Sequence, residues 1–262
     1  MKTDIAQETP MVSLLGTRFS MPREEKEPVE MNLYLRKGGV RPLIINLHGG
    51  AFIAGDADSM DAQSDRISNA WNVNVATVDY KLLSGSYDVP YGTTEVIDTV
   101  EYFRAHAEEY QIDPTAIFLL GYSAGAYYAV ASVLALKQEG IDVAGQIICY
   151  GFLGETNYTY LAMDESARTS IAPALFILAD NDPISESSLV YQKSLAANGI
   201  STQVKKYEGA LHTFMEGTLN IEGIASFIRI SEQELLARQA ESLVGEWINR
   251  VIEDKNRSGQ NL

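Results

Sequence analysis

Residues 116–130 read AIFLLGYSAGAYYAV, a short apolar run that is followed by a glycine-flanked serine and a helix-forming segment. The apolar run is typical of a strand that is buried on both faces of a parallel sheet. Gly121 and Gly125 leave room for a sharp turn and for a close approach between this strand and the next helix. We therefore expect Ser123 to lie on a tight strand-to-helix turn, at a helix N-terminus that favours negative charge.

Short apolar runs alternate with longer helical patterns on both sides of this stretch. Because such alternation builds parallel sheets through right-handed crossovers, it predicts an α/β sandwich with helices on both faces of the sheet. A run of alternating character at 29–35 predicts an additional, half-exposed strand. The other expected strands cover 42–47, 73–80, 116–120, 146–150, 174–179 and 202–207, and the expected helices cover about 59–70, 94–110, 124–138, 186–198 and 233–253.

The composition is that of a chain that buries a sizeable core, since 46% of its 262 residues are hydrophobic and 21% are charged. No repeat, low-complexity tract or Pro/Ser-rich linker divides the sequence. We therefore expect one domain over 1–262, with residues 1–28 as a polar N-terminal extension. The net charge of −15 would repel phosphate backbones and anionic lipid, so nucleic acid and a polybasic membrane anchor are poor expectations.

One segment raises the question of a membrane span. Residues 114–136 carry no charged side chain and are long enough to cross a bilayer. Gly121, Ser123 and Gly125 interrupt this segment at the expected turn, so we interpret it as a buried strand followed by a buried helix face. Residues 1–8 lack the apolar core of a signal peptide, and on that ground we expect a cytoplasmic protein.

Cysteine and histidine are scarce in this sequence. The one cysteine, Cys149, cannot form an intrachain disulfide and lies in an apolar run, so we expect it to be a small buried side chain. One cysteine and three histidines make a metal cage hard to build. We expect neither a metal nor a cofactor.

Polar clusters follow four of the expected strands, at the carboxyl ends where the chemistry of an open parallel sheet collects. They lie at 48–52, 121–125, 180–183 and 209–212, and they contain serine, aspartate and histidine in that chain order. A serine hydroxyl is a weak nucleophile near neutral pH, and it needs a base that is oriented by a carboxylate. The clusters therefore predict a nucleophile at Ser123 with partners from the later strands.

His212 follows the last expected strand, on the loop 208–214, and is the predicted general base. The other two histidines are less suitable for that role. His106 lies in a charged helical segment, where a solvated side chain is the ordinary arrangement. His48 precedes two glycines and is expected to brace their loop.

Two aspartates compete for the role of orienting acid, because Asp180 and Asp182 both follow the expected strand 174–179. Pro183 fixes its own backbone and restricts the residue before it. We therefore favour Asp182, and Asp180 would then be an ordinary turn or capping residue.

The segment His48-Gly49-Gly50-Ala51 is a candidate for binding an oxyanion. Attack on an ester carbonyl creates a negatively charged oxygen, which unencumbered backbone N–H groups stabilise. We expect donors from Gly49 and Gly50, and a further donor from Ala124, the residue next to the proposed nucleophile.

Together these segments resemble the α/β-hydrolases of the esterase and lipase type, close to the hormone-sensitive-lipase-like and small carbohydrate-esterase-like branches. The resemblance implies a three-layer α/β-hydrolase sandwich and a triad of Ser123, His212 and Asp182. It also implies that Gly49, Gly50 and Ala124 donate to the oxyanion. The matching pieces are 48–52, 78–82, 121–125, 182–184 and 211–214.

The sequence departs from that family in two places. Ala51 stands where the oxyanion motif of the family typically has a third glycine. The segment 151–171 is short for a region that often carries a cap, so we expect a minimal cap. Residues 216–231 form an apolar insertion, which either covers the pocket and lines an acyl site or packs on the sheet edge.

The sequence thus predicts a serine hydrolase that cleaves small carboxylic esters, with short acyl chains or acetylated small molecules and sugars, through an acyl-enzyme intermediate. Two other classes stay open: a related acyl hydrolase (a small peptidase, lactonase or arylformamidase) and a non-catalytic ligand-binding protein on the same scaffold. Tyr150, Tyr158 and Tyr160 either stack on a substrate or serve as packing residues. The oligomeric state is undecided, with a homo-oligomer left open.

Overall fold

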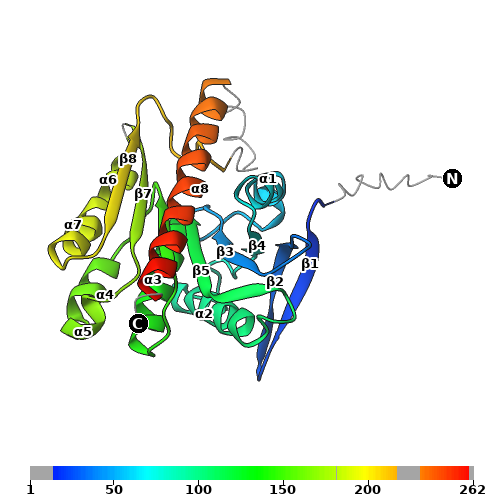
Figure 1. Ribbon diagram of the computed structural model, residues 1–262. Helices are drawn as coiled ribbons and strands as arrows, with labels where there is room; N and C mark the ends of the chain where they lie inside the picture. Colours follow the sequence, from blue (N-terminus) through cyan, green and yellow to red (C-terminus); the bar gives the residue numbers. More distant parts are fainter. Residues whose placement is uncertain (1–13, 181, 217–230, 260–262) are drawn as a thin grey trace.

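The computed structural model describes residues 14–180, 182–216 and 231–259. Within them, an eight-stranded sheet carries helices on both faces, which confirms the expected α/β sandwich (Figure 1). The strand order is β1-β2-β4-β3-β5-β6-β7-β8. The strand β2 runs antiparallel to both of its neighbours, β1 and β4, and the strands β3 to β8 are parallel to one another. The strands are β1 Thr17–Arg23, β2 Lys26–Tyr34, β3 Arg41–Leu47, β4 Asn74–Val78, β5 Ile112–Tyr122, β6 Gly145–Cys149, β7 Ala174–Ala179 and β8 Thr202–Tyr207.

The two faces of the sheet form two hydrophobic cores, because successive side chains of a strand point to opposite faces. In β3, Leu43 and Ile45 belong to the core under α2 and α3, whereas Ile44 belongs to the core under α1 and α8. Both cores are rich in aliphatic and aromatic side chains with almost no exposure. The helices are η1 Asp58–Met60, α1 Asp61–Trp71, α2 Val89–Ala105, α3 Ala124–Gln138, α4 Thr156–Ala162, α5 Glu165–Arg168, α6 Pro183–Ser187, α7 Leu189–Ala197 and α8 Ser231–Gly259.

Most elements lie where the sequence predicts them. The strands β7 and β8 and the helix α3 have the expected bounds, and residues 114–136 form parts of β5 and α3 as expected. The expected helix at 186–198 is instead two helices. The first, α6, begins earlier than expected, at Pro183, and the second, α7, covers most of the expected range.

The N-terminal extension is the element that the sequence describes least well. Residues 17–23 are not a plain polar extension but the edge strand β1, which pairs with β2. Met21 alone among the side chains of β1 is fully buried, so the strand has little of the apolar alternation that marks a strand in a sequence.

The described residues contain neither a membrane-spanning helix nor a cluster of metal-binding side chains. Among the helices of these ranges, none is both long enough and apolar enough to cross a membrane. In the same part of the chain, no group of three or more His, Cys, Asp or Glu side chains is placed to hold a metal ion.

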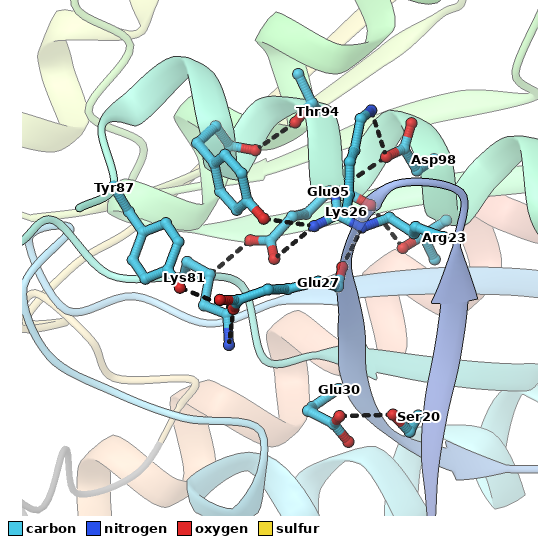
Figure 2. Close-up of polar contacts among 12 residues, drawn as sticks. Ser20, Arg23, Lys26, Glu27, Glu30, Lys81, Tyr87, Thr94, Glu95 and Asp98 are labelled. Atoms are coloured by element: carbon cyan, nitrogen blue, oxygen red, sulfur yellow. Dashed lines mark hydrogen bonds and ion pairs between the residues drawn. The ribbon is translucent and has the colours of Figure 1, made fainter.

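A buried arginine ties the β1–β2 hairpin to α2 (Figure 2). The Arg23 side chain is 3% exposed and forms an ion pair with Asp98 at 3.0 Å. Its guanidinium also donates to the Tyr91 hydroxyl at 2.7 Å and lies 3.6 Å from the Glu95 carboxylate. Glu95 in turn accepts a hydrogen bond from the Lys81 N–H at 2.6 Å. The network therefore joins the hairpin, α2 and the segment that follows β4.

We predict that Arg23→Ala lowers the free energy of unfolding by about 3 kcal/mol, because it takes the cation away from the buried Glu95 carboxyl group. Asp98, which is 21% exposed, keeps its ion pair with Lys26 at 3.1 Å. Urea unfolding at neutral pH measures the loss. The matched control is Arg18→Ala, which removes an ion pair from a side chain that is 69% exposed. That variant should lose less than about 1 kcal/mol. Equal losses in the two variants would contradict the assignment of Arg23 as the anchor.

Candidate active site

Ser123 lies on a strained turn between β5 and α3. Its backbone has φ 49° and ψ −112°, a left-handed φ that is uncommon for a residue with a side chain. A Cβ atom on Gly121 would lie 2.3 Å from the Gly125 carbonyl oxygen, and one on Gly125 would lie 2.2 Å from the Leu47 carbonyl oxygen. The turn therefore requires glycine at both flanking positions, as the sequence indicates.

The backbone of Ser123 is fixed by the neighbouring strand as well. Its N–H donates to the Cys149 carbonyl oxygen at 3.0 Å, and its own carbonyl oxygen accepts from the Phe152 N–H at 3.1 Å. Cys149 is fully buried, as expected, and burial raises the pKa of its thiol well above the ordinary value. The cysteine is thus a packing residue that positions the turn through its main chain.

The structure brings Ser123, His212 and Asp182 together in one hydrogen-bonded chain. The Ser123 hydroxyl lies 2.9 Å from His212 Nε2, and His212 Nδ1 lies 2.6 Å from Asp182 Oδ2. Ser123 and Asp182 are buried, whereas the imidazole is partly exposed. Because Nδ1–H donates to the carboxylate, Nε2 carries the lone pair that accepts the serine proton.

The two candidate aspartates have different partners. Asp182 caps the N-terminus of α6, where its Oδ1 accepts from the Ile184 N–H at 3.0 Å, so that its other oxygen is aimed at the imidazole. Asp180 pairs with Lys206 at 3.2 Å and accepts from the Gly209 N–H at 3.4 Å. The cap geometry therefore explains why Asp182 is the aspartate that contacts His212.

The remaining histidines have the structural roles that the sequence suggests. His106 ends α2, where its ring stacks on Tyr102 and its Nδ1–H donates to the Tyr102 carbonyl oxygen at 2.8 Å. His48 is fully buried and stacks on Tyr80 with ring centroids 4.2 Å apart. Its Nδ1–H donates to the Gly49 carbonyl oxygen at 2.6 Å, and burial lowers its pKa to about 4. A neutral His48 thus braces the loop that it begins.

The loop after β3 turns through three consecutive residues with positive φ. Gly50 has φ 124°, and a Cβ there would lie 1.8 Å from the Ala54 carbonyl oxygen. Ala51 and Phe52 follow with φ 53° and 68°. Ala51 therefore takes up a left-handed backbone at the position where the resemblance leads us to expect glycine. The Gly50 carbonyl oxygen accepts from the N–H groups of residues 53 and 54.

The main-chain N–H groups of Gly50, Ala51 and Ala124 are available to an external acceptor. In the described part of the chain, those of Gly50 and Ala51 have no hydrogen-bond acceptor. Ala124 is the first residue of α3, so its N–H has no acceptor within the helix. Free main-chain donors at a helix N-terminus and on an adjacent loop suit a developing negative charge.

Gly49 does not meet the expectation that it donates to an oxyanion. Its N–H donates to Glu216 Oε1 at 2.6 Å, and a Cβ on Gly49 would lie 2.8 Å from the same oxygen. The N–H is therefore occupied by a carboxylate from a residue that is 167 positions away in the chain. The sequence alone did not single out Glu216. The available signal was its position: it is an acidic residue four positions after His212 that directly follows two apolar residues, 214 and 215.

Glu216 is a buried carboxyl group, 6% exposed. Burial raises its pKa to about 7, and the Gly49 N–H and the neighbouring Tyr150 hydroxyl partly oppose this rise. Among the described residues, the titratable groups that face it are the phenols of Tyr80, Tyr122 and Tyr150 and the thiol of Cys149, all of them neutral at neutral pH. Glu216 therefore ionises near neutrality in an environment of neutral groups.

The raised pKa of Glu216 predicts a stability that depends on pH. The folded state binds a proton more tightly than the unfolded chain, whose glutamate pKa is 4.5, so the free energy of unfolding should fall as pH rises from about 4.5 to about 7 and then level off. Glu216→Gln should lack this component. Relative to the wild type, it should gain about 2–3 kcal/mol between pH 5 and pH 8 in urea unfolding. Parallel curves for the two proteins would contradict the shift.

The structure decides the role of two of the three tyrosines singled out in the sequence, but it does not test the role of the insertion. Tyr150 and Tyr160 are fully buried, Tyr150 edge-on against the His212 ring at 5.2 Å and Tyr160 against Tyr191 at 5.5 Å, so both are packing residues. Tyr158 alone of the three is exposed, at 74%. Of the insertion 216–231, residues 217–230 lie outside the described residues, so its role as a pocket cover stays a prediction.

Three aromatic side chains that the sequence analysis did not single out lie beside the turn. The Phe152 ring is exposed, and its main chain bonds to Ser123 as described above. The Phe52 ring lies edge-on to Phe152 at 6.1 Å and to Tyr127 at 5.6 Å. The available signal was their position in the sequence: Phe52 is two residues after Gly50, Tyr127 is one helical turn after Ser123, and Phe152 directly follows the expected strand and Gly151.

Comparisons with known proteins agree with this architecture. A family described as having the alpha/beta hydrolase fold matches residues 44–169. Among solved structures, carboxyl esterase 2 from Tuber melanosporum is 17% identical with a TM-score of 0.73, covering 94% of this chain and 89% of its own. A hyperthermophilic esterase from Pyrobaculum calidifontis is 20% identical with a TM-score of 0.75, covering 90% and 83%. The carboxylesterase EstE1 from a metagenomic library is 20% identical with a TM-score of 0.72, covering 92% and 91%.

Proposed function

Because the chain belongs to the α/β-hydrolase superfamily, we propose that it is a serine hydrolase that cleaves carboxylic esters. One observation carries the proposal: a serine on a strained strand-to-helix turn shares a hydrogen bond with a histidine that an aspartate orients. The likeness to proteins that are themselves described as esterases supports the ester as the substrate class.

In the proposed reaction, Ser123 Oγ attacks the ester carbonyl carbon while His212 Nε2 takes the hydroxyl proton. The Asp182 carboxylate, buried and 2.6 Å from Nδ1, stabilises the imidazolium that forms and holds the ring in the required tautomer. His212 then returns the proton to the leaving alcohol oxygen as the carbon–oxygen bond breaks. The acyl-enzyme that remains is hydrolysed by a water molecule, which His212 activates in the same way.

The oxyanion of the tetrahedral intermediate would be stabilised by the free N–H groups of Gly50, Ala51 and Ala124. This set replaces the one expected from the sequence, because the N–H of Gly49 already donates to Glu216. The N-terminus of α3 adds a favourable dipole at the same place. Each such donor is typically worth about 2.7–4 kcal/mol of barrier.

The substrate that fits best is a small ester with a short acyl chain, including an acetylated small molecule or sugar. The ring of Phe52 lies edge-on to those of Tyr127 and Phe152, and Phe152 is joined to the nucleophile residue through a main-chain hydrogen bond. Such rings suit a small apolar group or the face of a sugar. The net charge of −15 favours neutral over anionic substrates.

We predict that Ser123→Ala abolishes hydrolysis of p-nitrophenyl acetate, with a fall in kcat of about 10⁴-fold or more, because the nucleophile is lost. A fluorophosphonate probe should label the wild type at Ser123 and leave the variant unlabelled, as read by mass spectrometry. Circular dichroism checks that the variant is folded. Turnover that survives in the folded variant would rule out Ser123 as the nucleophile, and a wild type that is active only on amides or lactones would rule out the ester.

The two neighbouring aspartates provide a matched pair for a second prediction. Asp182→Asn should lower kcat by about 10³- to 10⁴-fold, because the amide stabilises neither the required tautomer nor the imidazolium. Asp180→Asn removes a carboxylate two residues away, where it pairs with Lys206, and should keep kcat within about threefold. Steady-state kinetics on p-nitrophenyl acetate decides between them. A larger loss in the Asp180 variant would reverse the assignment of the acid.

A further inference from the structure

The loop that carries the proposed base and the loop that carries the proposed oxyanion donors are joined by one side chain. Glu216 lies four residues after His212, at the end of a turn in which its N–H donates to the Thr213 carbonyl oxygen at 3.1 Å. Its Oε1 accepts the N–H of Gly49, the residue directly before the free donors of Gly50 and Ala51. The contact therefore spans the site on which both loops converge.

The position of Glu216 is costly for the fold. The carboxyl group is almost fully buried, and its second oxygen, Oε2, makes no hydrogen bond of good geometry within the described residues, although the Tyr150 hydroxyl is a neighbour. A buried carboxyl group destabilises a protein when one oxygen is poorly satisfied and, as in the described part of this chain, no cation pairs with it. A carboxylate kept at such a site is better explained by what its satisfied oxygen does than by a contribution to stability.

The oxyanion loop is a segment that needs such an anchor. Gly50, Ala51 and Phe52 all have positive φ, and backbone in this region persists only when the surroundings hold it. His48 fixes the carbonyl side of Gly49 through its Nδ1–H, and Glu216 fixes the N–H side. The two contacts together determine how Gly49 is oriented, and with it the direction in which the next two N–H groups point.

We propose that Glu216 is a positioning residue: by accepting the Gly49 N–H, its carboxyl oxygen aims the N–H groups of Gly50 and Ala51 at the oxyanion. The inference rests on the proposed function, since an oxyanion forms only if Ser123 attacks a carbonyl. Glu216 itself touches no reacting atom. Its loss should therefore act on the transition state, where the charge develops, and lower kcat much more than it changes KM.

Three variants test the role of the acceptor oxygen. Glu216→Ala should lower kcat on p-nitrophenyl acetate by about 10- to 100-fold with KM within threefold, less than the 10²- to 10³-fold typical of a donor that is removed outright. Glu216→Gln keeps an acceptor oxygen at the same reach and should restore most of that loss. The control is Glu241→Ala, which removes another buried carboxylate. Glu241 lies on α8 and pairs with Arg66 of α1, so its loss should cost stability but leave kcat within threefold.

The kinetics of these variants distinguish a positioning role of Glu216 from a merely structural one. A folded Glu216→Ala variant with kcat within threefold of the wild type would overturn the proposal. Equal impairment in the Ala and Gln variants would overturn it too, because the acceptor oxygen would then be irrelevant. A wild type that hydrolyses no ester, or a Ser123→Ala variant that retains activity, would instead refute the proposed function.

A double-mutant cycle keeps the proposal testable if Glu216→Ala proves unstable. The three atoms nearest to a Cβ on Gly49 all belong to Glu216, at 2.8, 3.0 and 3.3 Å, so Gly49→Ala should disturb the contact between Gly49 and Glu216 by a steric clash. We expect Gly49→Ala to lower the rate of fluorophosphonate labelling at Ser123 at least tenfold in the wild type. In the Glu216→Gly background the clash is absent, and the further loss should be under threefold. Additive effects would overturn the proposal.

Discussion

The close approach of the start of α3 to the end of β3 is the constraint on which the site depends. A side chain at Gly125 would meet the carbonyl oxygens of Leu47 and His48 at 2.2 and 2.4 Å, so only glycine permits this contact. It places the N-terminus of the helix, with its free N–H of Ala124, directly beside the loop that leaves β3. The proposed nucleophile lies near the proposed donors Gly50 and Ala51, which are more than 70 residues away in the chain, for this reason.

Two carboxyl groups then orient the imidazole of His212 and the oxyanion loop, which the glycine-mediated contact does not orient by itself. Asp182 uses one oxygen to cap α6 and the other to hold the imidazole of His212. Glu216 uses one oxygen to hold the main chain of the oxyanion loop. In both cases the carboxyl group accepts a hydrogen bond from a backbone N–H. The sheet places the loops next to one another, and these two acids fix the orientation of the imidazole and of the oxyanion loop.

The sequence predicts the helices, strands and turns well, but it predicts poorly which contacts orient the side chains and loops of the site. The reason is physical. Periodicity and glycine spacing report on local structure, so α3, β7 and the turn at Ser123 are located from residues close to them in the chain. The choice between Asp180 and Asp182 depends on the cap of α6, which the sequence indicates only through Pro183. The engagement of Gly49 by Glu216 links positions 167 residues apart, and no local pattern contains it. The strand β1 is hard to recognise in the sequence because only Phe19 and Met21 of its side chains are large and apolar.

The unusual backbone of the site has a consequence for how this protein tolerates change. Five non-glycine residues with positive φ, at 51, 52, 123, 150 and 213, belong to the loops around the hydroxyl and the imidazole. Thr213 is already β-branched, but the other four residues are not, and a β-branched replacement at 51, 52, 123 or 150 would add backbone strain that destabilises the fold. Consensus or directed-evolution libraries that treat these positions as ordinary loop residues would therefore lose folded clones there first, whereas the helix surfaces leave ample freedom for adaptation to heat or solvent.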